Sequence, residues 1–188
     1  IVDGLVETVG ALKVGDPMDP ETFIGPLVAA RQRDRVEGYI KAGKEEGAKV
    51  AIGGGRPSHM PRGWYVEPTV FRDVDNSMRV AREEIFGPVI VVIPYNDEAD
   101  ALRIANDSDY GLSGTVWTSD IDHGLEIARR VRTGTFTVNN FLMEFSAPFG
   151  GYKCSGLGRE LGPEGLEAYL ESKSINLPMG YEVAPLSN

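Results

Sequence analysis

The sequence predicts an α/β protein with a mostly parallel sheet and helices on both faces. A continuous apolar run, PVIVVIPY at 88–95, is typical of a strand that is buried on both faces. Between 88 and 140 strand patterns alternate with helix patterns, which favours parallel strands connected by helices. Hydrophobic residues make up 41 % of the 188 residues, which suits an ordinary globular core.

The chain opens with two predicted helices. Apolar residues recur at helical spacing from Ile1 to Leu12, with no capping residue before them. This start in the middle of a pattern indicates a longer parent protein whose upstream part is absent. After a turn-rich loop, Pro26 suits the first turn of a helix of about 20 residues that closes at Gly47.

The remaining elements follow in order to a glycine-rich loop and a last helix. The sequence predicts strands at 48–55, 64–71, 88–95, 111–119 and 134–140, and helices at 97–108, 120–133 and 163–173. One more strand is predicted in the segment SINL, 174–177. We therefore expect one compact α/β domain over 1–173 and a tail with a strand over 174–188.

Composition limits the partners and the compartment. The net charge is −9 and no basic stripe is visible, so a nucleic-acid or anionic-membrane surface is not expected. No apolar run approaches the ~18 residues of a membrane helix, and no signal-peptide pattern opens the chain. The single cysteine, Cys154, excludes an internal disulfide framework and indicates a reducing cytoplasm.

Two adjacent glutamates, Glu83 and Glu84, stand before the apolar run at 88–95. Neighbours in a strand point to opposite faces, so these two cannot form a facing carboxylate pair for glycoside hydrolysis. One interpretation is two solvated side chains. The other is that Glu84 accepts hydrogen bonds from ribose hydroxyls while Phe86, on the same face, lies against a flat ring.

The glycine-rich loop near the end does not match a dinucleotide fingerprint. Gly156, Gly158 and Gly162 have a spacing one residue too long, and no βαβ unit surrounds them. The alternative is a loop that needs glycines in order to pass close to a neighbouring element.

Cys154 is a weak candidate for a nucleophile. A reactive thiolate needs a positive field or a base beside it, and nothing in the sequence places His59 or His123 near Cys154. Two histidines and one cysteine at no metal-ligand spacing also disfavour a zinc site.

Four segments in this order and spacing carry a resemblance: EEIFGPVI, YGLSGTVWTSD, TGTFTVNN and PFGGYKCSGLGRELGPEGLEAY. They resemble the carboxy-terminal, catalytic-domain part of the NAD(P)-dependent aldehyde dehydrogenase superfamily, over essentially the whole chain. The resemblance implies oxidation of an aldehyde to a carboxylic acid with NAD or NADP, through a cysteine thiohemiacetal.

The resemblance also implies roles for individual residues. Glu84 would hold the nicotinamide-ribose hydroxyls and Phe86 would contact the nicotinamide, the same pair that strand alternation selects. Phe149 and Phe145 would line the aldehyde channel.

Some members of this superfamily carry further functions in the K-x-S-G and G-R-E-x-G segments. By resemblance Glu160 would have a relay role, and backbone near Lys153 and Gly156 would bind a monovalent cation.

The family's nucleophilic cysteine, general-base glutamate and dinucleotide domain have no counterpart in this sequence. The 188 residues alone are therefore expected to hold no productive NAD and to turn over nothing. The alternative hypotheses are a folded non-catalytic fragment or truncated gene product that acts at most as an oligomerising module, and a stand-alone thiol enzyme using Cys154. Family members pair a strand such as SINL with a neighbouring subunit, which predicts a homo-oligomer, a dimer or a tetramer.

Overall fold

The computed structural model describes residues 1–182 and divides the chain into two compact units, Ile1–Ser108 and Asp109–Asn188. The predicted division into a domain over 1–173 and a tail over 174–188 stays a prediction, and 183–188 of that tail lie outside the described residues. Each unit is considered below by itself.

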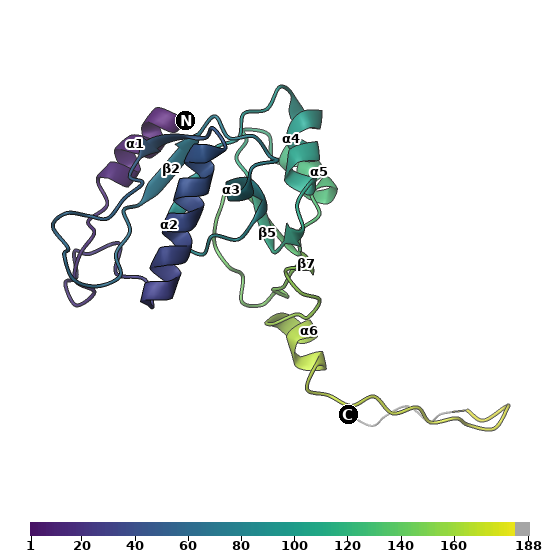
Figure 1. Ribbon diagram of the computed structural model, residues 1–188. Helices are drawn as coiled ribbons and strands as arrows, with labels where there is room; N and C mark the ends of the chain where they lie inside the picture. Colours follow the sequence, from purple (N-terminus) through teal and green to yellow (C-terminus); the bar gives the residue numbers. More distant parts are fainter. Residues whose placement is uncertain (183–188) are drawn as a thin grey trace. The chain divides into compact units, whose positions relative to one another are not determined.

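The first unit is built on a three-stranded sheet in the order β1-β2-β3, and Figure 1 shows helices around it. Its strands are β1 (Lys49–Ile52), β2 (Thr69–Arg72) and β3 (Val89–Val91), and its helices are α1 (Val2–Gly10), α2 (Ala30–Glu45), α3 (Arg79–Arg82) and α4 (Glu98–Asn106). β1 pairs with β2 antiparallel, and β2 pairs with β3 parallel.

The two N-terminal helices, α1 and α2, cover opposite faces of this sheet. Val70 and Phe71 are neighbours in β2, so their side chains point to different faces. α2 approaches the Phe71 face, where a β-carbon at Gly43 would lie 3.1 Å from the Phe71 ring. α1 approaches the other face, where a β-carbon at Gly10 would lie 3.1 Å from Ile52, the residue that pairs with Val70. Figure 1 shows α1 and α2 on the two sides of β2.

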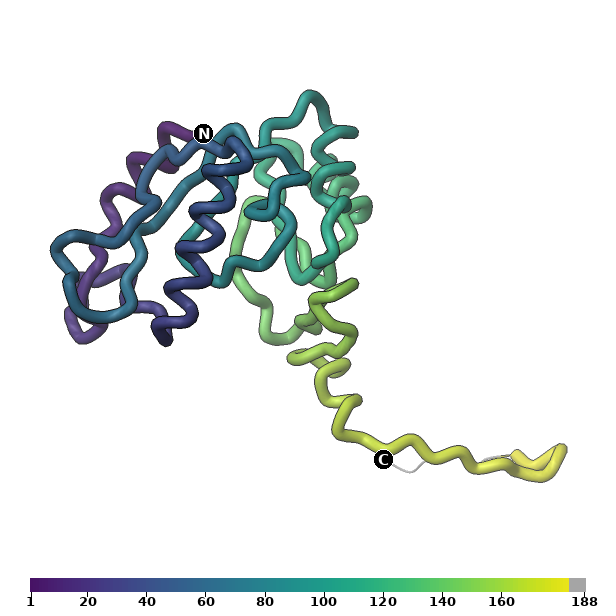
Figure 2. Tube along the Cα trace, in the orientation of Figure 1, coloured from purple at the N-terminus to yellow at the C-terminus, as the bar shows by residue number. Residues whose placement is uncertain are grey.

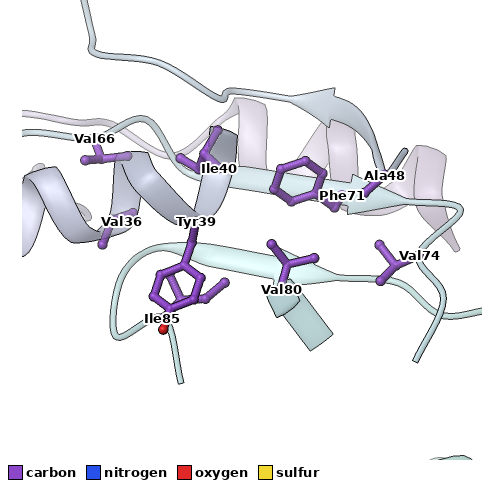
Figure 3. Close-up of a cluster of buried hydrophobic side chains, with 9 residues drawn as sticks. All are labelled: Val36, Tyr39, Ile40, Ala48, Val66, Phe71, Val74, Val80 and Ile85. Carbon is purple, nitrogen blue, oxygen red and sulfur yellow. The ribbon is translucent and has the colours of Figure 1, made fainter. Parts of the chain in front are cut away.

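The core of the first unit lies between α2 and the sheet, as Figure 3 shows. Its buried members are Val36, Tyr39, Ile40, Ala48, Val66, Phe71, Val74, Val80 and Ile85. Val80 comes from α3 and Ile85 from the segment that follows it, so this stretch is fixed against α2. The core therefore positions the two glutamates that stand between them.

Two predictions for this unit need correction. The second helix begins at Ala30 and not at Pro26, although Gly47 with φ +101° ends it as expected. The run at 88–95 forms only the three-residue strand β3, which lies at an edge of the sheet. Val89 and Val91 pack on the core while Ile90 is 47 % exposed, so the prediction of a strand buried on both faces is wrong for this chain.

The second unit contains two small sheets. β5 (Ser113–Val116) pairs with β6 (Thr135–Val138) in parallel, and α5 (Ile121–Arg130) connects them. β4 (Tyr110–Gly111) pairs with β7 (Tyr152–Lys153) antiparallel, and the short helix α6 (Gly162–Glu167) follows. α5 lies close on β6, because a β-carbon at Gly124 would be 2.8 Å from Val138.

Parallel pairing is present at β2–β3 and β5–β6, and only the β5–β6 pair falls within the residues 88–140 for which the alternation of patterns predicted it. The strands are nevertheless divided among small sheets, two of which contain antiparallel pairs. Side-chain periodicity identifies extended residues, but it carries no information about which strands share a sheet.

The C-terminal part differs from the prediction. α6 ends at Glu167, well before 173, and residues 174–177 form no strand within the described chain. An extended segment becomes a strand only when another strand supplies its hydrogen bonds. None of the helices in the described part of the chain has the length and apolarity to cross a membrane.

Candidate functional site

Glu83 is held in a local ion-pair network. Its carboxylate accepts hydrogen bonds from Arg79 (Nε to Oε1 2.9 Å, Nη2 to Oε2 3.1 Å) and from the Tyr39 hydroxyl (2.8 Å). The Arg79 guanidinium, with a further contribution from Tyr39, lowers the pKa of Glu83 from 4.5 to about 2. Glu83 therefore ties α3 to α2 and is not available to a ligand.

This network predicts a pH-dependent stability. A lowered pKa in the folded state means that the Glu83 carboxylate stabilises the fold fully above pH 4.5, and that this contribution is lost as the pH falls toward 2. Glu83→Gln should lower the free energy of unfolding at pH 7, and the difference from wild type should shrink between pH 4.5 and 2. Urea denaturation across this range measures it.

Glu84→Gln is the matched control for that experiment. The Glu84 carboxylate has no hydrogen-bond or ion-pair partner within the described chain. The unfolding curves of Glu84→Gln should therefore match those of the wild type at every pH. A Glu83→Gln effect of the same size at pH 7 and pH 2 would contradict the assigned ion pair.

The backbone of the segment 84–87 is fixed by two side chains of α2. The Gln32 amide donates to the carbonyls of Phe86 (2.7 Å) and Ile85 (3.3 Å), and the Arg35 guanidinium donates to the carbonyl of Glu84. Ile85 is buried in the core. A β-carbon at Gly87 would overlap Val36 of α2, so the glycine permits this close approach.

The side chains of Glu84 and Phe86 consequently point away from the core. Glu84 is exposed and Phe86 is 72 % exposed. Within residues 1–182 the Glu84 carboxylate has no hydrogen-bond or ion-pair partner. The strand alternation used to pair Glu84 with Phe86 does not apply to this segment, because Phe86 is in the left-handed region with φ +56°. The structure nonetheless presents both predicted side chains on a rigid backbone.

This pair has a definite chemical capacity. A carboxylate without a protein partner can accept hydrogen bonds from two hydroxyl groups. The exposed Phe86 ring offers a flat apolar face within the same fixed segment. Glu84 and Phe86 therefore fit a ligand that combines hydroxyl groups with a flat ring, as a nicotinamide riboside does.

The second unit contains a cavity of about 190 Å³ on the β5–β6 sheet. Its lining residues are Ser113, Gly114, Thr135, Thr137, Phe141, Leu142, Met143 and Phe149. Phe149 belongs to the lining, whereas Phe145 is 72 % exposed and lies outside it, and the substrate-pocket roles of both residues stay predictions. Sequence reasoning missed Phe141, Leu142 and Met143, although three apolar residues directly after a strand, where a polar loop is expected, are a usable signal.

Glu160 lies beside Phe149 in the structure. The two residues form an antiparallel bridge, with N to O distances of 2.7 Å in both directions. The Arg159 guanidinium braces the same loop by donating to the carbonyls of Gly151 (2.9 Å) and Gly158 (2.8 Å). The exposed Glu160 side chain and Phe149 therefore belong to one fixed loop, whose path can be followed in Figure 2.

Lys153 and Gly156 form the ends of a tight turn next to β7. Both have positive φ angles (+55° and +108°), and the Gly156 amide donates to the Lys153 carbonyl at 3.3 Å. Cys154 in this turn is exposed, and its amide donates to the Asp109 carbonyl at 2.9 Å. No group of three histidine, cysteine, aspartate or glutamate side chains suited to a metal ion occurs within residues 1–182.

Comparison with known proteins identifies the family. The model of the aldehyde dehydrogenase family matches residues 1–175. The chain therefore belongs to the aldehyde dehydrogenase family.

Individual relatives and solved structures agree with this assignment. Geranial dehydrogenase of Castellaniella defragrans is 53 % identical over 94 % of this chain, and betaine aldehyde dehydrogenase of Brucella melitensis is 44 % identical over 98 %. An aldehyde dehydrogenase of Mycobacterium tuberculosis complexed with NAD+ matches with TM-score 0.94 and 55 % identity, over 97 % of this chain and 38 % of its own. A mutant of aldehyde dehydrogenase C of Pseudomonas syringae, complexed with NAD+ and octanal, matches with TM-score 0.90 and 46 % identity, over 93 % and 36 %.

The match covers a limited part of these relatives. The chain spans 37 % of the length of the geranial dehydrogenase and 38 % of the betaine aldehyde dehydrogenase.

Proposed function

We propose that this chain is the carboxy-terminal, catalytic-domain portion of an NAD(P)-dependent dehydrogenase that oxidises an aldehyde to a carboxylic acid. The observation that carries the proposal is the pair Glu84 and Phe86. It combines a carboxylate without a hydrogen-bond or ion-pair partner in the described part of the chain with an exposed ring, on a backbone fixed by α2. The NAD+ present in structures of relatives supports NAD or NADP as the cofactor. Such a cofactor supplies the hydride acceptor when bound.

The proposal gives individual side chains the following roles. The Glu84 carboxylate accepts the hydrogen bonds of the ribose hydroxyls, and the Phe86 ring orients the nicotinamide. Phe149 forms part of the wall against which the aldehyde rests, and Phe145 also contacts the aldehyde in the full-length protein. Glu160, whose backbone pairs with that of Phe149, has a relay role for a proton in this proposal.

One further role is proposed for the turn at the end of β7. The turn from Lys153 to Gly156 is the proposed monovalent cation site, in which backbone carbonyls would be the ligands. Cys154 is not the nucleophile in this proposal. In this proposal the nucleophilic cysteine and the general-base glutamate of the full-length protein lie outside these 188 residues, and the 188 residues alone are inactive. The single cysteine supports the cytoplasm as the compartment.

A second candidate, an oligomerising module without catalysis, is favoured by the tail. Its exposed apolar residues are Ile175, Leu177, Met179 and Tyr181. We propose that the segment SINL forms its strand against another subunit, which would give a homodimer or a homotetramer. A full-length enzyme can contain this contact between subunits, and the contact does not depend on catalysis.

One pair of assays tests both candidates. The full-length protein should reduce NAD+ or NADP+ when octanal is added, and the purified 188-residue chain should not. Turnover by the chain alone would refute its inactivity, whereas failure of the full-length protein to oxidise any aldehyde with either cofactor would refute the dehydrogenase proposal. Light scattering of the full-length protein with and without 174–188 measures the oligomer, which should dissociate when the tail is removed.

A further inference from the structure

The first unit contains a cavity of about 200 Å³ where the end of α1 meets the sheet. Most of its lining is aliphatic or proline, and includes Val9 and Leu12 from the end of α1 and Ile52 from β1. Two side chains of the lining can carry charge, Glu67 and His59. The cavity therefore combines apolar walls with a small number of polar groups, which is the usual composition of a site for a small organic molecule.

Glu67 brings a carboxylate to this cavity. The residue is partly buried, and within residues 1–182 its carboxylate has no hydrogen-bond or ion-pair partner. Its backbone is fixed, because its amide donates to the Gly55 carbonyl (2.9 Å) and its carbonyl accepts from the Thr69 hydroxyl (2.8 Å). The carboxylate is therefore held at the cavity with its capacity to accept hydrogen bonds unused.

Other partly buried carboxylates of the same unit are paired with arginine. Asp100 lies 2.6 Å from Arg103, and Glu37 is paired with Arg56. The lining of the cavity contains no lysine or arginine that could do the same for Glu67. Partial removal of a carboxylate from water without a cation is unfavourable, and a cationic ligand would compensate for this cost.

The end of α1 adds to the negative potential of the cavity. A helix C-terminus carries a partial negative charge, and the last turn of α1 contains no basic side chain to offset it. His59 places its Nε2 atom 2.9 Å from the Val14 carbonyl oxygen. Since a carbonyl only accepts, Nε2 is the donor, and Nδ1 of the neutral ring is a further acceptor. These groups all favour a ligand that donates hydrogen bonds and carries positive charge.

We propose that this cavity binds a small organic ammonium ion with an apolar body, such as benzylammonium, and that Glu67 is its anchor. A dry cavity of ~150 Å³ accommodates benzene, so 200 Å³ has room for a ring with one aminomethyl group. The ammonium group donates to the Glu67 carboxylate, and the ring packs on the aliphatic walls. This inference does not rest on the proposed function.

Other classes of ligand fit this lining less well. A divalent metal ion needs several oxygen ligands, whereas the lining supplies one carboxylate. An anion would face both Glu67 and the end of α1. A neutral aromatic molecule could pack on the same walls, but it would leave the carboxylate without a partner. The carboxylate therefore determines the class of ligand.

Calorimetric titration of the full-length protein with benzylammonium chloride at pH 7 tests the proposal. Benzylammonium should bind, and benzyl alcohol and benzoate, which keep the ring without the cation, should bind about tenfold more weakly or worse. Absence of benzylammonium binding would mean that water or another segment of the full-length protein fills the cavity, and would overturn the proposal. Equal affinities for benzylammonium and benzyl alcohol would also overturn it, and this comparison needs no variant.

Two variants locate the ion. Glu67→Gln keeps the size of the side chain and removes its charge, so benzylammonium affinity should fall about tenfold or more while benzyl alcohol affinity stays the same. Its unfolding curve should remain near wild type, because the removed charge has no partner in the described part of the chain. Glu7→Gln, on an exposed position of α1 outside the lining, is the matched control and should bind benzylammonium as the wild type does. Equal losses in both variants, or none in Glu67→Gln, would refute the assignment to Glu67.

Discussion

Glu84→Ala is expected to weaken NAD+ binding to the full-length protein by about 10- to 100-fold. A hydrogen bond to a charged group is worth roughly 1.5–3 kcal/mol, and every 1.4 kcal/mol is a tenfold change in affinity. The Glu84 carboxylate has no partner within residues 1–182, so its removal leaves no orphaned group and should not disturb the fold. Titration of NAD+ followed by protein fluorescence measures the affinity without relying on turnover.

Glu83 provides the matched control one residue away. Glu83→Gln breaks the contacts with Arg79 and Tyr39 and should reduce stability while leaving NAD+ affinity at pH 7 unchanged. Glu84→Gln keeps an acceptor oxygen without the charge, so its loss of affinity should lie between wild type and Glu84→Ala. An affinity loss in Glu83→Gln equal to that in Glu84→Ala would reject the assignment of the ligand to Glu84.

The two glutamates show what a sequence pattern can and cannot determine. Alternation placed Glu84 and Phe86 on one side, and the structure does expose both side chains. The backbone is not a strand, however, and Phe86 has a positive φ. The partners of Glu83 could not be predicted, because Tyr39 is 44 residues away and meets it only when α2 packs on α3.

The cavity of the second unit, too, could be predicted from the sequence only in part. Phe149 was assigned to a substrate pocket from a motif, while Phe141, Leu142 and Met143 follow a strand without any motif. Their place in the lining depends on the side-chain oxygen of Asn140, which accepts hydrogen bonds from the amides of Phe141 and Leu142. These two bonds are local, but the Thr115 hydroxyl of β5 also donates to the Asn140 carbonyl from 25 residues away, and no local propensity reports that bond. The pairing of the strands could not be predicted for the same reason, because it depends on residues that lie far apart in the sequence.

The glycine-rich loop was predicted to need Gly156, Gly158 and Gly162 in order to pass close to another part of the chain. This holds at Gly162, where a β-carbon would lie 3.0 Å from the Pro148 nitrogen, but not at Gly156 or Gly158, where a β-carbon would meet nothing within 4 Å.

The closest approaches lie at the start of the loop. A β-carbon at Gly134, just before β6, would overlap the carbonyl oxygen of Gly150 and lie 2.7 Å from its carbonyl carbon. A β-carbon at Gly150 would in turn overlap the Gly158 carbonyl oxygen. Three passes of backbone therefore meet with no side chain between them, and this contact sets the position of Phe149.

Gly134→Ala is consequently expected to lower the free energy of unfolding by about 3 kcal/mol, at the upper end of the range for overpacking. The obstructing atoms are backbone, which cannot rotate away as a side chain can. Displacement of Gly150 should also loosen the bridge between Phe149 and Glu160. Urea denaturation measures the stability, and hydrogen exchange at the amides of Phe149 and Glu160 measures the bridge.

Gly158→Ala is the matched control for this change, because a β-carbon at Gly158 meets nothing within 4 Å and the residue has no positive φ. It should leave both the unfolding curve and the exchange rates of the two bridge amides near wild type. Similar behaviour of Gly134→Ala and Gly158→Ala would mean that the loop accommodates a methyl group at Gly134. Faster exchange confined to the Gly134 variant would instead show that this backbone contact holds the cavity lining in place, because Phe149 belongs to both the bridge and the cavity.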